Sequence, residues 1–406
     1  MPDALATLRS VATVRERCAN ITRAVDAGGS EHFTLARERL SGVVDRVEAL
    51  MRSRDPLLNV PYHSRWRHFE AGGVDRKAQL DAALAGRTQA AQARARIDLT
   101  VLSVLLDAGA GAPWRYVEAP HGASFARSEG LGVASFHAFM TGQFSSDPGD
   151  PYRVDAAALK RLTTQQLGEL FQVSPANPLV GLEGRARLLR CLGESLQAQP
   201  AVFGGDGRPG GLFDTLTHHG RNHRVAASRV LRALLDHFAT IWPSSHALCG
   251  EPLGDCWPHP LAGGAGESAG WVPFHKLSQW LVYSLLEPFE WAGVTLTEPE
   301  ALTGLPEYRN GGLLLDAGVI VPRDAAAVHR RYAAGDAFIV EWRAATVTLL
   351  DDVALQLRSR LHKTRDELPL ARVLEGGTWA AGRAIARELR DDGAPPLHID
   401  SDGTVF

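Results

Sequence analysis

The sequence predicts a mainly α-helical, multi-helical globular protein with one or two short β-hairpins, and three observations support this fold class. Apolar residues recur at helical spacings of three, four and seven along most of the chain. Strand-like patterns are confined to a few short runs. The composition, 45% hydrophobic and 22% charged over 406 residues, is that of a folded protein with a large core.

The longest helical pattern covers residues 4–52. Gly28-Gly29-Ser30 divides it into two helices, and Asp55-Pro56 ends the second. A helix over about 76–107 ends at Gly109-Ala110-Gly111. Further helices are expected near residues 155–172, 179–198, 225–241, 274–287, 324–333, 337–361 and 378–391.

Two hairpins account for the expected strands. The first would join Leu313–Leu315 to Val319–Val321, and the second would join residues 397–399 to residues 404–406 around Asp402-Gly403. Both interruptions contain Asp and Gly, which are typical turn residues.

A loop rich in Gly and Pro, Leu248–Pro273, is the best candidate for a domain boundary. It would separate an N-terminal helical region, residues 1–250, from a C-terminal helical region with the short hairpins, residues 251–406. A single continuous compact domain is the alternative.

Charge and cysteine content exclude several classes of protein. The net charge of −3 predicts neither a nucleic-acid partner nor a membrane partner. No apolar run is long enough to span a membrane, and acidic residues interrupt the N-terminal segment where a targeting signal would lie. Four cysteines in so long a chain do not form a disulfide framework. We therefore expect a cytoplasmic protein.

Familiar cofactor and metal motifs are absent or weak. There is no phosphate-binding P-loop and no nucleophile elbow, and the glycines of 109–113 follow a helix instead of a strand. His218, His219 and His223 include an i,i+4 pair, which suits either metal ligands or a polar helix start. No cofactor and no metal are predicted, but a metal near His218–His223 stays open.

The segment 61–69 is the first dense cluster of polar groups. Pro61 favours extended backbone before it, and continued extension would place His63, Arg65 and Arg67 on one face. Three such groups suit a phosphate or carboxylate. A solvated loop that pairs with acids such as Glu70 is the alternative.

The helix expected near 338–357 carries an arginine on its apolar stripe. Arg343 falls within the stripe and must find an anion, because an unpaired buried charge is very costly. That anion is either a structural carboxylate or a ligand. Glu341 falls on the opposite face, where spacing favours solvent exposure. The stripe consists of Ile339, Thr346, Leu350, Val353 and Leu357.

Polar groups border the apolar stripe of the helix expected over 274–287. Pro273 suits its first turn, and Pro288 should end it. His275, Lys276 and Gln279 then line either a site or an ordinary surface.

Gly376-Gly377-Thr378 precedes the last long helix. Thr378 is expected to be its N-cap, and free N–H groups at such a start can hold an anion.

Nine long strings resemble the uracil-catabolism protein family of the URC pathway, in particular its fourth component. The resemblance covers residues 60–406 in the family's order. The strings are VPYHSRWRHFEAGG (60–73), DLTVLSVLLDAGAG (98–111), FARSEGLGVASF (125–136), NPLVGLEGR (177–185), VPFHKLSQWLVYSLLEP (272–288), LTGLPEYRNGGLLLDAGV (302–319), IVEWRAATVTLLD (339–351), LEGGTWAAGR (374–383) and SDGTVF (401–406).

This resemblance implies a role in a route that releases uracil nitrogen as urea through ribosylated, phosphorylated intermediates. The expected reaction is hydrolysis of the N-glycosidic bond of a ribosylurea phosphate to urea and ribose 5-phosphate. The expected partner is a small anionic substrate of the ribose phosphate type, and association with other uracil-catabolism enzymes is possible on this reading. The alternatives are a metal-dependent amidohydrolase acting on an opened-pyrimidine ureide and a non-catalytic scaffold of the pathway.

Cleavage of a glycosidic C–N bond needs a carboxylate near C1 and an acid for the leaving nitrogen. Among the carboxylates of the family strings, Glu307, Glu341 and Asp402 are favoured because donors or aromatic residues flank each one. His275 is the expected neutral proton donor. The expected substrate-binding residues are His63, Arg65, Arg67, Lys276, Gln279, Tyr308, Arg309, Asn310, Arg343, Gly377, Thr378 and Trp379.

Overall fold

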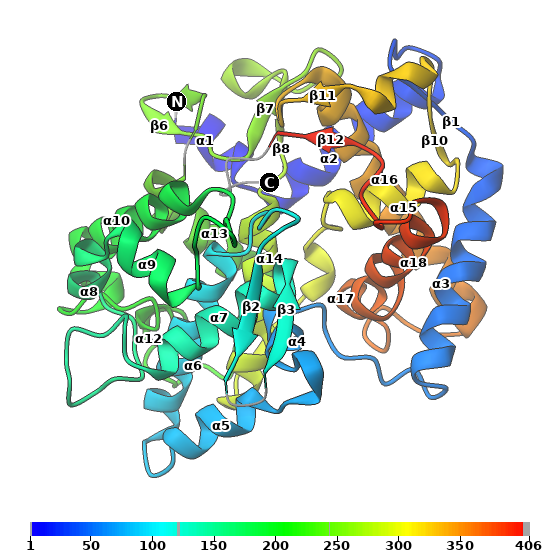
Figure 1. The fold of residues 1–406 in the computed structure, drawn as a ribbon. Coiled ribbons are helices and arrows are strands. Elements are labelled where there is room, and N and C mark those ends of the chain that lie inside the picture. The colour runs from blue at the N-terminus through cyan, green and yellow to red at the C-terminus, as the bar shows by residue number, and fades with distance from the viewer. Residues whose placement is uncertain (1, 120–121, 243, 401–406) are drawn as a thin grey trace. The chain divides into compact units, whose positions relative to one another are not determined.

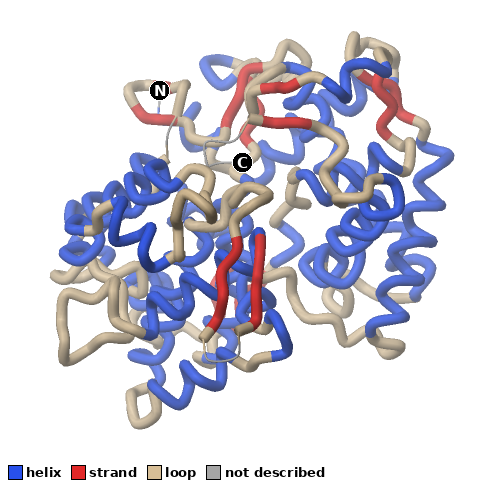
Figure 2. The backbone as a smooth tube through the Cα atoms, in the orientation of Figure 1, coloured by secondary structure: helices blue, strands red, loops and turns tan. Residues whose placement is uncertain are grey.

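A computed structural model describes residues 2–119, 122–242 and 244–400. Helices dominate, and the strands of the described residues form only two-stranded sheets (Figure 2). The predicted mainly α fold class is therefore confirmed. The chain is organised as two compact units, each assembled from separate stretches of sequence.

Unit 1 contains residues 1–63, 246–279 and 298–400. Its helices are α1 (Pro2–Leu8), α2 (Val11–Asp26), α3 (Leu40–Arg54), α15 (Tyr308–Asp316), α16 (Ala337–Leu361), α17 (Leu370–Val373), a π-helical turn (Leu374–Thr378) and α18 (Trp379–Leu389). Its strands are β1 (Phe33–Leu35), β5 (Ala247–Leu248), β6 (Glu251–Pro252), β7 (Cys256–Pro258), β8 (Trp271–Pro273), β10 (Ile320–Pro322), β11 (Arg331–Tyr332) and β12 (His398–Ile399).

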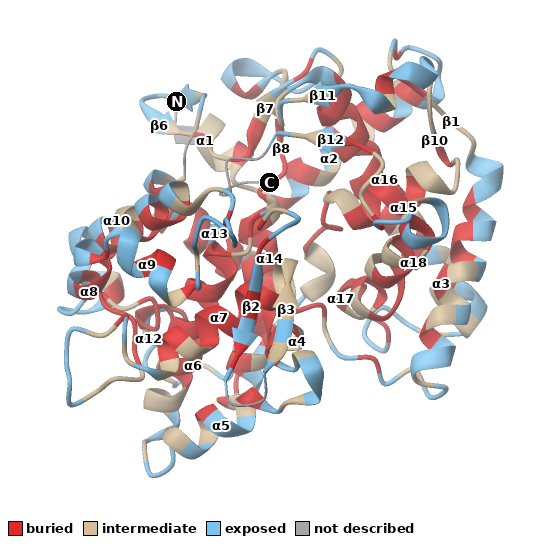
Figure 3. Cartoon of the chain, in the orientation of Figure 1, coloured by how far each residue is buried: buried red, intermediate tan, exposed pale blue. Residues whose placement is uncertain are grey.

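The core of unit 1 forms around the long helix α16. Helix α2 and helix α15 both pack against it, and α18 packs against α15 and α3 (Figure 1). The predicted apolar stripe is confirmed, because Ile339, Leu350 and Val353 are all fully buried. Figure 3 colours the ribbon of both units by burial. The periodicity of this segment thus predicts its helix and the burial of its stripe, but not the burial of residues 338–347 on every side.

Unit 2 contains residues 64–245 and 280–297. Its helices are α4 (Arg65–Phe69), α5 (Arg76–Ala83), α6 (Gln89–Leu105), α7 (Arg127–Met140), α8 (Ala156–Arg161), α9 (Thr164–Leu170), α10 (Leu182–Ala198), α11 (Pro200–Phe203), α12 (Gly211–Thr217) and α13 (Ala227–His237). Its strands are β2 (Arg115–Glu118), β3 (Ala123–Ala126), β4 (Arg224–Ala226) and β9 (Thr295–Thr297).

Unit 2 is built around α6, whose C-terminal half is buried on every side. Helices α7, α10 and α12 pack against it. The single helix predicted over 76–107 is instead two helices, because Gly86 adopts the left-handed conformation between them. The segment predicted at 155–172 is likewise divided, and Thr163 starts α9 through a capping box with Gln166.

Helix α14 (Lys276–Trp291) begins in unit 1 and continues in unit 2. The prediction that Pro288 ends it is wrong, because Pro288 lies inside the helix. A proline there removes one backbone hydrogen bond. The helix persists because its neighbours Leu285, Leu286 and Phe289 are buried in the core.

The first predicted hairpin is wrong. Leu313–Leu315 belong to α15, and β10 pairs with β1, antiparallel, instead of with its neighbour in sequence. The apolar run is helical because it continues the helix that Glu307 caps and because Leu313 and Leu314 are buried. The first strand of the second predicted hairpin is β12, which pairs in parallel with β11. The other predicted strand, residues 404–406, lies outside the described residues.

The helix predicted over 324–333 is only a short 3₁₀ turn, Ala325–His329, followed by β11. All four cysteines are free thiols. Among the described residues, no helix is both long and apolar enough to cross a membrane.

Candidate functional site

A buried histidine paired with a carboxylate is the first component of the candidate site, in unit 1. His63 follows an extended segment, and its backbone N–H donates to the carbonyl of Ala371. Its Nδ1 lies 2.7 Å from Oε2 of Glu375. Because the carboxylate accepts the Nδ1 proton, the lone pair of the neutral ring lies on Nε2. Such an imidazole can take a proton from water, and the ring of Trp379 lies 6.0 Å away, centroid to centroid.

Glu307 is the second component, and it is the N-cap residue of α15. Its carboxylate accepts the N–H groups of Arg309 at 2.7 Å and Asn310 at 2.6 Å. Burial raises the pKa of Glu307, although these two N–H groups, the charge of Lys276 and, when it is protonated, His63 act in the opposite direction. A carboxyl group with a raised pKa is suited to donate a proton near neutral pH.

A buried hydrogen bond between Thr378 and Asn310 links the π-helical turn to α15. The Thr378 hydroxyl donates to Oδ1 of Asn310 at 2.8 Å. The prediction that Thr378 is an N-cap is wrong, because its φ of −67° and ψ of −42° are helical and the π-helical turn continues into α18. The two preceding glycines serve close packing: a Cβ on Gly377 would lie 2.6 Å from Cγ1 of Val47.

Arg343 forms a fully buried ion pair with Asp255. Its NH1 and NH2 donate to Oδ1 and Oδ2 of Asp255, both at 2.7 Å. The same carboxylate also accepts the backbone N–H of Lys276 at 3.0 Å and Nε1 of Trp257 at 2.9 Å. The anion predicted to pair with Arg343 is thus the Asp255 carboxylate, which also fixes the start of α14. Whether Arg343 also contacts substrate stays a prediction.

Asp255 has a depressed pKa. Burial opposes its ionisation, but the Arg343 guanidinium and the donors around the carboxylate outweigh burial and hold the pKa well below its ordinary value. Asp255 is therefore a stable anion at neutral pH.

His275 immediately precedes α14 and Gln279 lies in its first turn, and the polar side-chain atoms of both bond to residues of unit 1. His275 Nε2 donates to the carbonyl of Leu8 at 2.8 Å, and burial lowers its pKa. The Gln279 amide donates to Thr303 and to the carbonyl of Phe274, and its oxygen accepts the Thr303 N–H at 2.8 Å. Both residues hold the fold of the site, and their roles toward substrate stay predictions.

Glu341 is buried, so the expectation of solvent exposure is wrong. Ser30 donates to its Oε2 at 2.5 Å, and Nε2 of His259 lies 3.4 Å from its Oε1. The helical wheel fails here because the segments around Ser30 and His259 cover the face that spacing leaves open. The proposed catalytic role of Glu341 stays a prediction.

Two further predicted residues lie on α15 next to Glu307. Arg309 is buried and donates to the carbonyl of Gly393 at 3.1 Å, while its guanidinium lies 5.3 Å from the ring centroid of Tyr308. Asp402 lies outside the described residues.

Arg65 and Arg67 belong to unit 2 and not to the unit that contains His63. The prediction of one extended face is wrong, because the chain turns into α4 after Ser64, whose hydroxyl accepts the N–H of Trp66. Arg65 is fully buried, where it contacts Asp107 at 2.9 Å and Nδ1 of His68 at 2.8 Å. Arg67 pairs with Glu287 at 2.6 Å.

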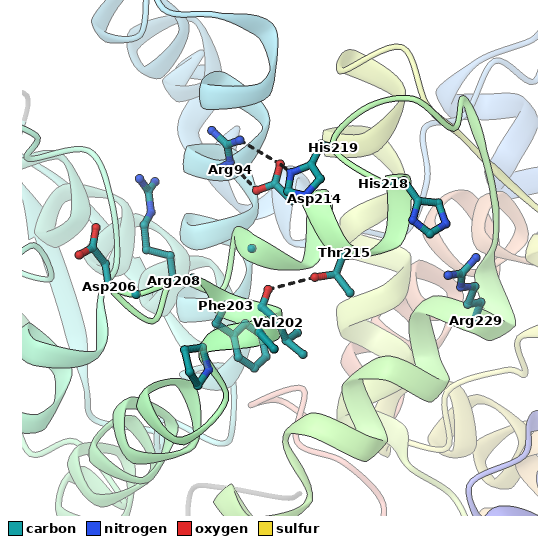
Figure 4. Close-up of a pocket in the computed structure, with 15 residues that line it drawn as sticks. Arg94, Val202, Phe203, Asp206, Arg208, Asp214, Thr215, His218, His219 and Arg229 are labelled. Carbon is teal, nitrogen blue, oxygen red and sulfur yellow. Dashed lines mark hydrogen bonds and ion pairs between the residues drawn. The ribbon is translucent and has the colours of Figure 1, made fainter.

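The histidines considered as metal ligands do not share a helix face. Helix α12 ends at Thr217, and both His218 and His219 follow it with left-handed backbone. The two histidines line a pocket of unit 2 (Figure 4). In the part of the chain that the structure describes, no three His, Cys, Asp or Glu residues are grouped to hold a metal ion.

His63, Lys276 and Glu307 are among the site residues predicted from the sequence, whereas Glu375 and Asp255 are not. Both carboxylates lie within the family strings, so the strings were the available signal. Their partners are 312 and 88 residues away along the chain. A local sequence pattern cannot show which residues so far apart in the chain will pair.

Comparison with known proteins places the chain in a family. Residues 7–406 match a family model described as "Protein of unknown function (DUF1688)". The chain is 39% identical over 433 residues to "Uracil catabolism protein 4" of Lachancea kluyveri, covering 98% of each protein. It is also 39% identical over 412 residues to "Protein urg3" of Schizosaccharomyces pombe, covering 100% of this chain and 99% of the relative. The resemblance drawn from the motifs is confirmed, and the chain belongs to this uracil-catabolism family, DUF1688.

Proposed function

We propose that this protein is an enzyme of uracil catabolism that hydrolyses the N-glycosidic bond of ribosylurea 5-phosphate, which yields urea and ribose 5-phosphate. The name of the Lachancea kluyveri relative supports the pathway. The observation that carries the reaction is the His63–Glu375 pair in the neighbourhood of Glu307, whose pKa is raised. One group is suited to accept a proton and the other to donate one.

In this mechanism His63 is the base and Glu307 the acid. Nε2 of His63 removes a proton from water as the water oxygen bonds to C1 of the ribose. Glu307 protonates the departing nitrogen as the C1–N bond breaks, so that urea leaves neutral. Return of the proton from His63 to Glu307 through solvent restores both groups. Glu375 orients the imidazole and stabilises its charged form.

The charge of the cluster suits an anionic substrate. Lys276 is one of only four lysines in the sequence, and its charge acts on Glu307. A lysine ammonium binds phosphate as a point charge. Trp379 offers an aromatic ring beside His63, a surface typical of sugar sites.

The test is incubation of the purified full-length protein with ribosylurea 5-phosphate, with urea and ribose 5-phosphate both quantified. We expect both products in equal amounts. Glu307→Gln should lower kcat by about 10²–10⁴-fold, which is the usual contribution of a general acid. The rate of the unaltered enzyme should fall as pH rises through the raised pKa of Glu307, because only the protonated carboxyl can donate. This alkaline limb should vanish in Glu307→Gln.

Glu38→Gln is the matched control, because Glu38 is exposed on the surface of unit 1. Its kcat should equal that of the unaltered enzyme. The metal-dependent amidohydrolase predicts that EDTA abolishes turnover, whereas the proposed hydrolysis continues in EDTA. Binding of the compound without any release of urea would contradict the proposal and favour the scaffold.

A further inference from the structure

Unit 2 contains a cavity of about 660 Å³ that shares no residue with the His63–Glu307 site. Its walls come from α6, from α11 and the turn that follows it, from α12 and the two histidines after it, and from α13 (Figure 4). Small-molecule sites typically have volumes of about 300–1,000 Å³. The cavity is therefore large enough for a metabolite.

Two arginines of the cavity wall are held in place by carboxylates. Arg94 donates two hydrogen bonds to Asp214, at 2.6 and 2.9 Å. Arg208 donates twice to Asp98, which is fully buried and also accepts the backbone N–H of Gly210 at 2.6 Å. These bonds fix both the arginines and the glycine-rich turn, so the wall is built before any ligand arrives.

Two other basic side chains of the wall, both exposed to solvent, have no such partner among the described residues. Within the described residues, Arg229 on α13 and His218 at the end of α12 form neither an ion pair nor a side-chain hydrogen bond. In Figure 4 the guanidinium of Arg229 points toward the imidazole of His218. Donors that face one cavity without an acceptor are suited to a phosphate, which accepts several charge-assisted hydrogen bonds.

The backbone at this end of the cavity is strained. His218 and His219 have φ values of 49° and 60°, a region that residues other than glycine seldom adopt. The hydrogen bond from the His219 N–H to the Asp214 carbonyl, 2.8 Å long, holds the turn. Strain of this kind costs about 1–3 kcal/mol per residue and is concentrated at ligand sites.

The rest of the cavity wall is better suited to the hydroxyl groups of a sugar than to an aromatic nucleobase. Asp206, Asp214 and Thr215 offer oxygen acceptors. Phe203 cannot serve as a stacking surface, because it is buried and stacked on Phe238 with ring centroids 5.5 Å apart. We propose that this cavity binds a sugar phosphate, with the phosphate between Arg229 and His218 and the sugar hydroxyls on Asp206 and Asp214.

The test is calorimetric titration of the full-length protein with ribose 5-phosphate, ribose and inorganic phosphate. Arg229→Gln and His218→Asn should each weaken ribose 5-phosphate binding at this cavity by about 10–100-fold, the loss expected for a hydrogen bond to a charged group. Asparagine is chosen because it tolerates left-handed backbone. Ribose should bind far more weakly than its phosphate.

Arg232→Gln is the matched control, because Arg232 is exposed on the same helix and does not line the cavity. It should bind ribose 5-phosphate like the unaltered protein. Identical binding in all variants, equal weakening by Arg229→Gln and Arg232→Gln, or equal binding of ribose would each overturn the proposal. Urea release is measured in parallel. If the unaltered protein releases no urea, the proposed hydrolysis is wrong, but the effect of Arg229→Gln on binding still shows whether the cavity binds a sugar phosphate.

Discussion

At the scale of single residues, the ion pair between Asp255 and Arg343 ties together three distant parts of unit 1. Asp255 binds the guanidinium from α16 and the backbone at the start of α14, and it accepts Nε1 of Trp257. The guanidinium also lies 4.0 Å from the ring centroid of Phe274. Because both charges are buried, the loss of either one leaves the other without compensation.

Asp255→Asn should lower the free energy of unfolding at pH 7 by about 3–5 kcal/mol, which is the usual cost of breaking a buried pair. Asp255 has a depressed folded-state pKa, so its stabilising contribution is complete above the unfolded value of about 3.9. It is lost as pH falls from there toward the folded pKa. The difference between unaltered protein and variant should therefore shrink below about pH 4. Urea denaturation at a series of pH values measures it.

Asp45→Asn is the control for this prediction. Asp45 pairs with Arg360 on the surface, so its replacement should cost at most about 1 kcal/mol. If Asp255→Asn costs no more than Asp45→Asn, the buried pair does not stabilise unit 1 as argued.

The same ion pair shows how much of a buried interaction can be predicted from the sequence alone. Helical spacing places Arg343 on a buried stripe, and electrostatics then requires an anion, which the structure contains. Nothing in the spacing identifies Asp255 as that anion. The burial of Glu341 was missed for the same reason, since Ser30 and His259 reach it from distant segments.

At the scale of elements, local patterns identify most helices but fail where tertiary packing decides. Spacing locates α10 and α16 close to their observed limits. The two helices predicted within residues 4–52 differ more, because the first is divided into α1 and α2, and β1 and a 3₁₀ turn precede α3 in the second. The run Leu313–Leu315 resembles a strand, yet it is helical because α15 is capped by Glu307 and packs against α18 and α16. In the candidate site, Glu307 was predictable from its flanking donors, whereas the approach of α18 to α15 was not.

Close packing of α18 on α15 makes a glycine essential at Gly382. A Cβ at this position would lie 2.1 Å from the carbonyl oxygen of Arg309. Gly382→Ala should therefore force the two helices apart and lower the unfolding free energy by about 1–3 kcal/mol. It should also reduce urea release, because α15 carries Glu307 at its N-terminus.

Gly42→Ala is the matched control for that prediction. Gly42 is exposed in α3, and a Cβ there would meet no atom within 4 Å. Alanine should raise the unfolding free energy by about 0.5–1 kcal/mol, since glycine is the poorer helix former. Chemical denaturation of the two variants side by side should show opposite signs, and a stabilising Gly382→Ala would contradict the packing argument.

At the scale of the whole molecule, each unit is assembled from parts that are far apart in the sequence. In unit 1, α16 packs on α2, which lies near the N-terminus. In unit 2, β9 pairs in parallel with β4 in the register Val225 to Leu296. A boundary based on composition, such as the loop Leu248–Pro273, cannot reveal such interleaving, because composition carries no information on which segments meet.

This organisation predicts how the chain responds to division at residue 250. A fragment of residues 1–250 lacks β9 and all of α14. A fragment of residues 251–406 lacks the helices α2 and α3 that pack around α16. Neither fragment buries a complete core, so neither should show a cooperative thermal transition by far-ultraviolet circular dichroism.

The two fragments together should regain that transition, because every contact within each unit is then available. A full-length chain cleaved at one engineered protease site between β5 and β6 is the control, since the turn at Cys249 and Gly250 joins these two strands at the surface. This nicked protein should melt close to the intact protein. A cooperative transition in isolated residues 251–406 would instead show that the C-terminal region folds independently, as the composition boundary predicts.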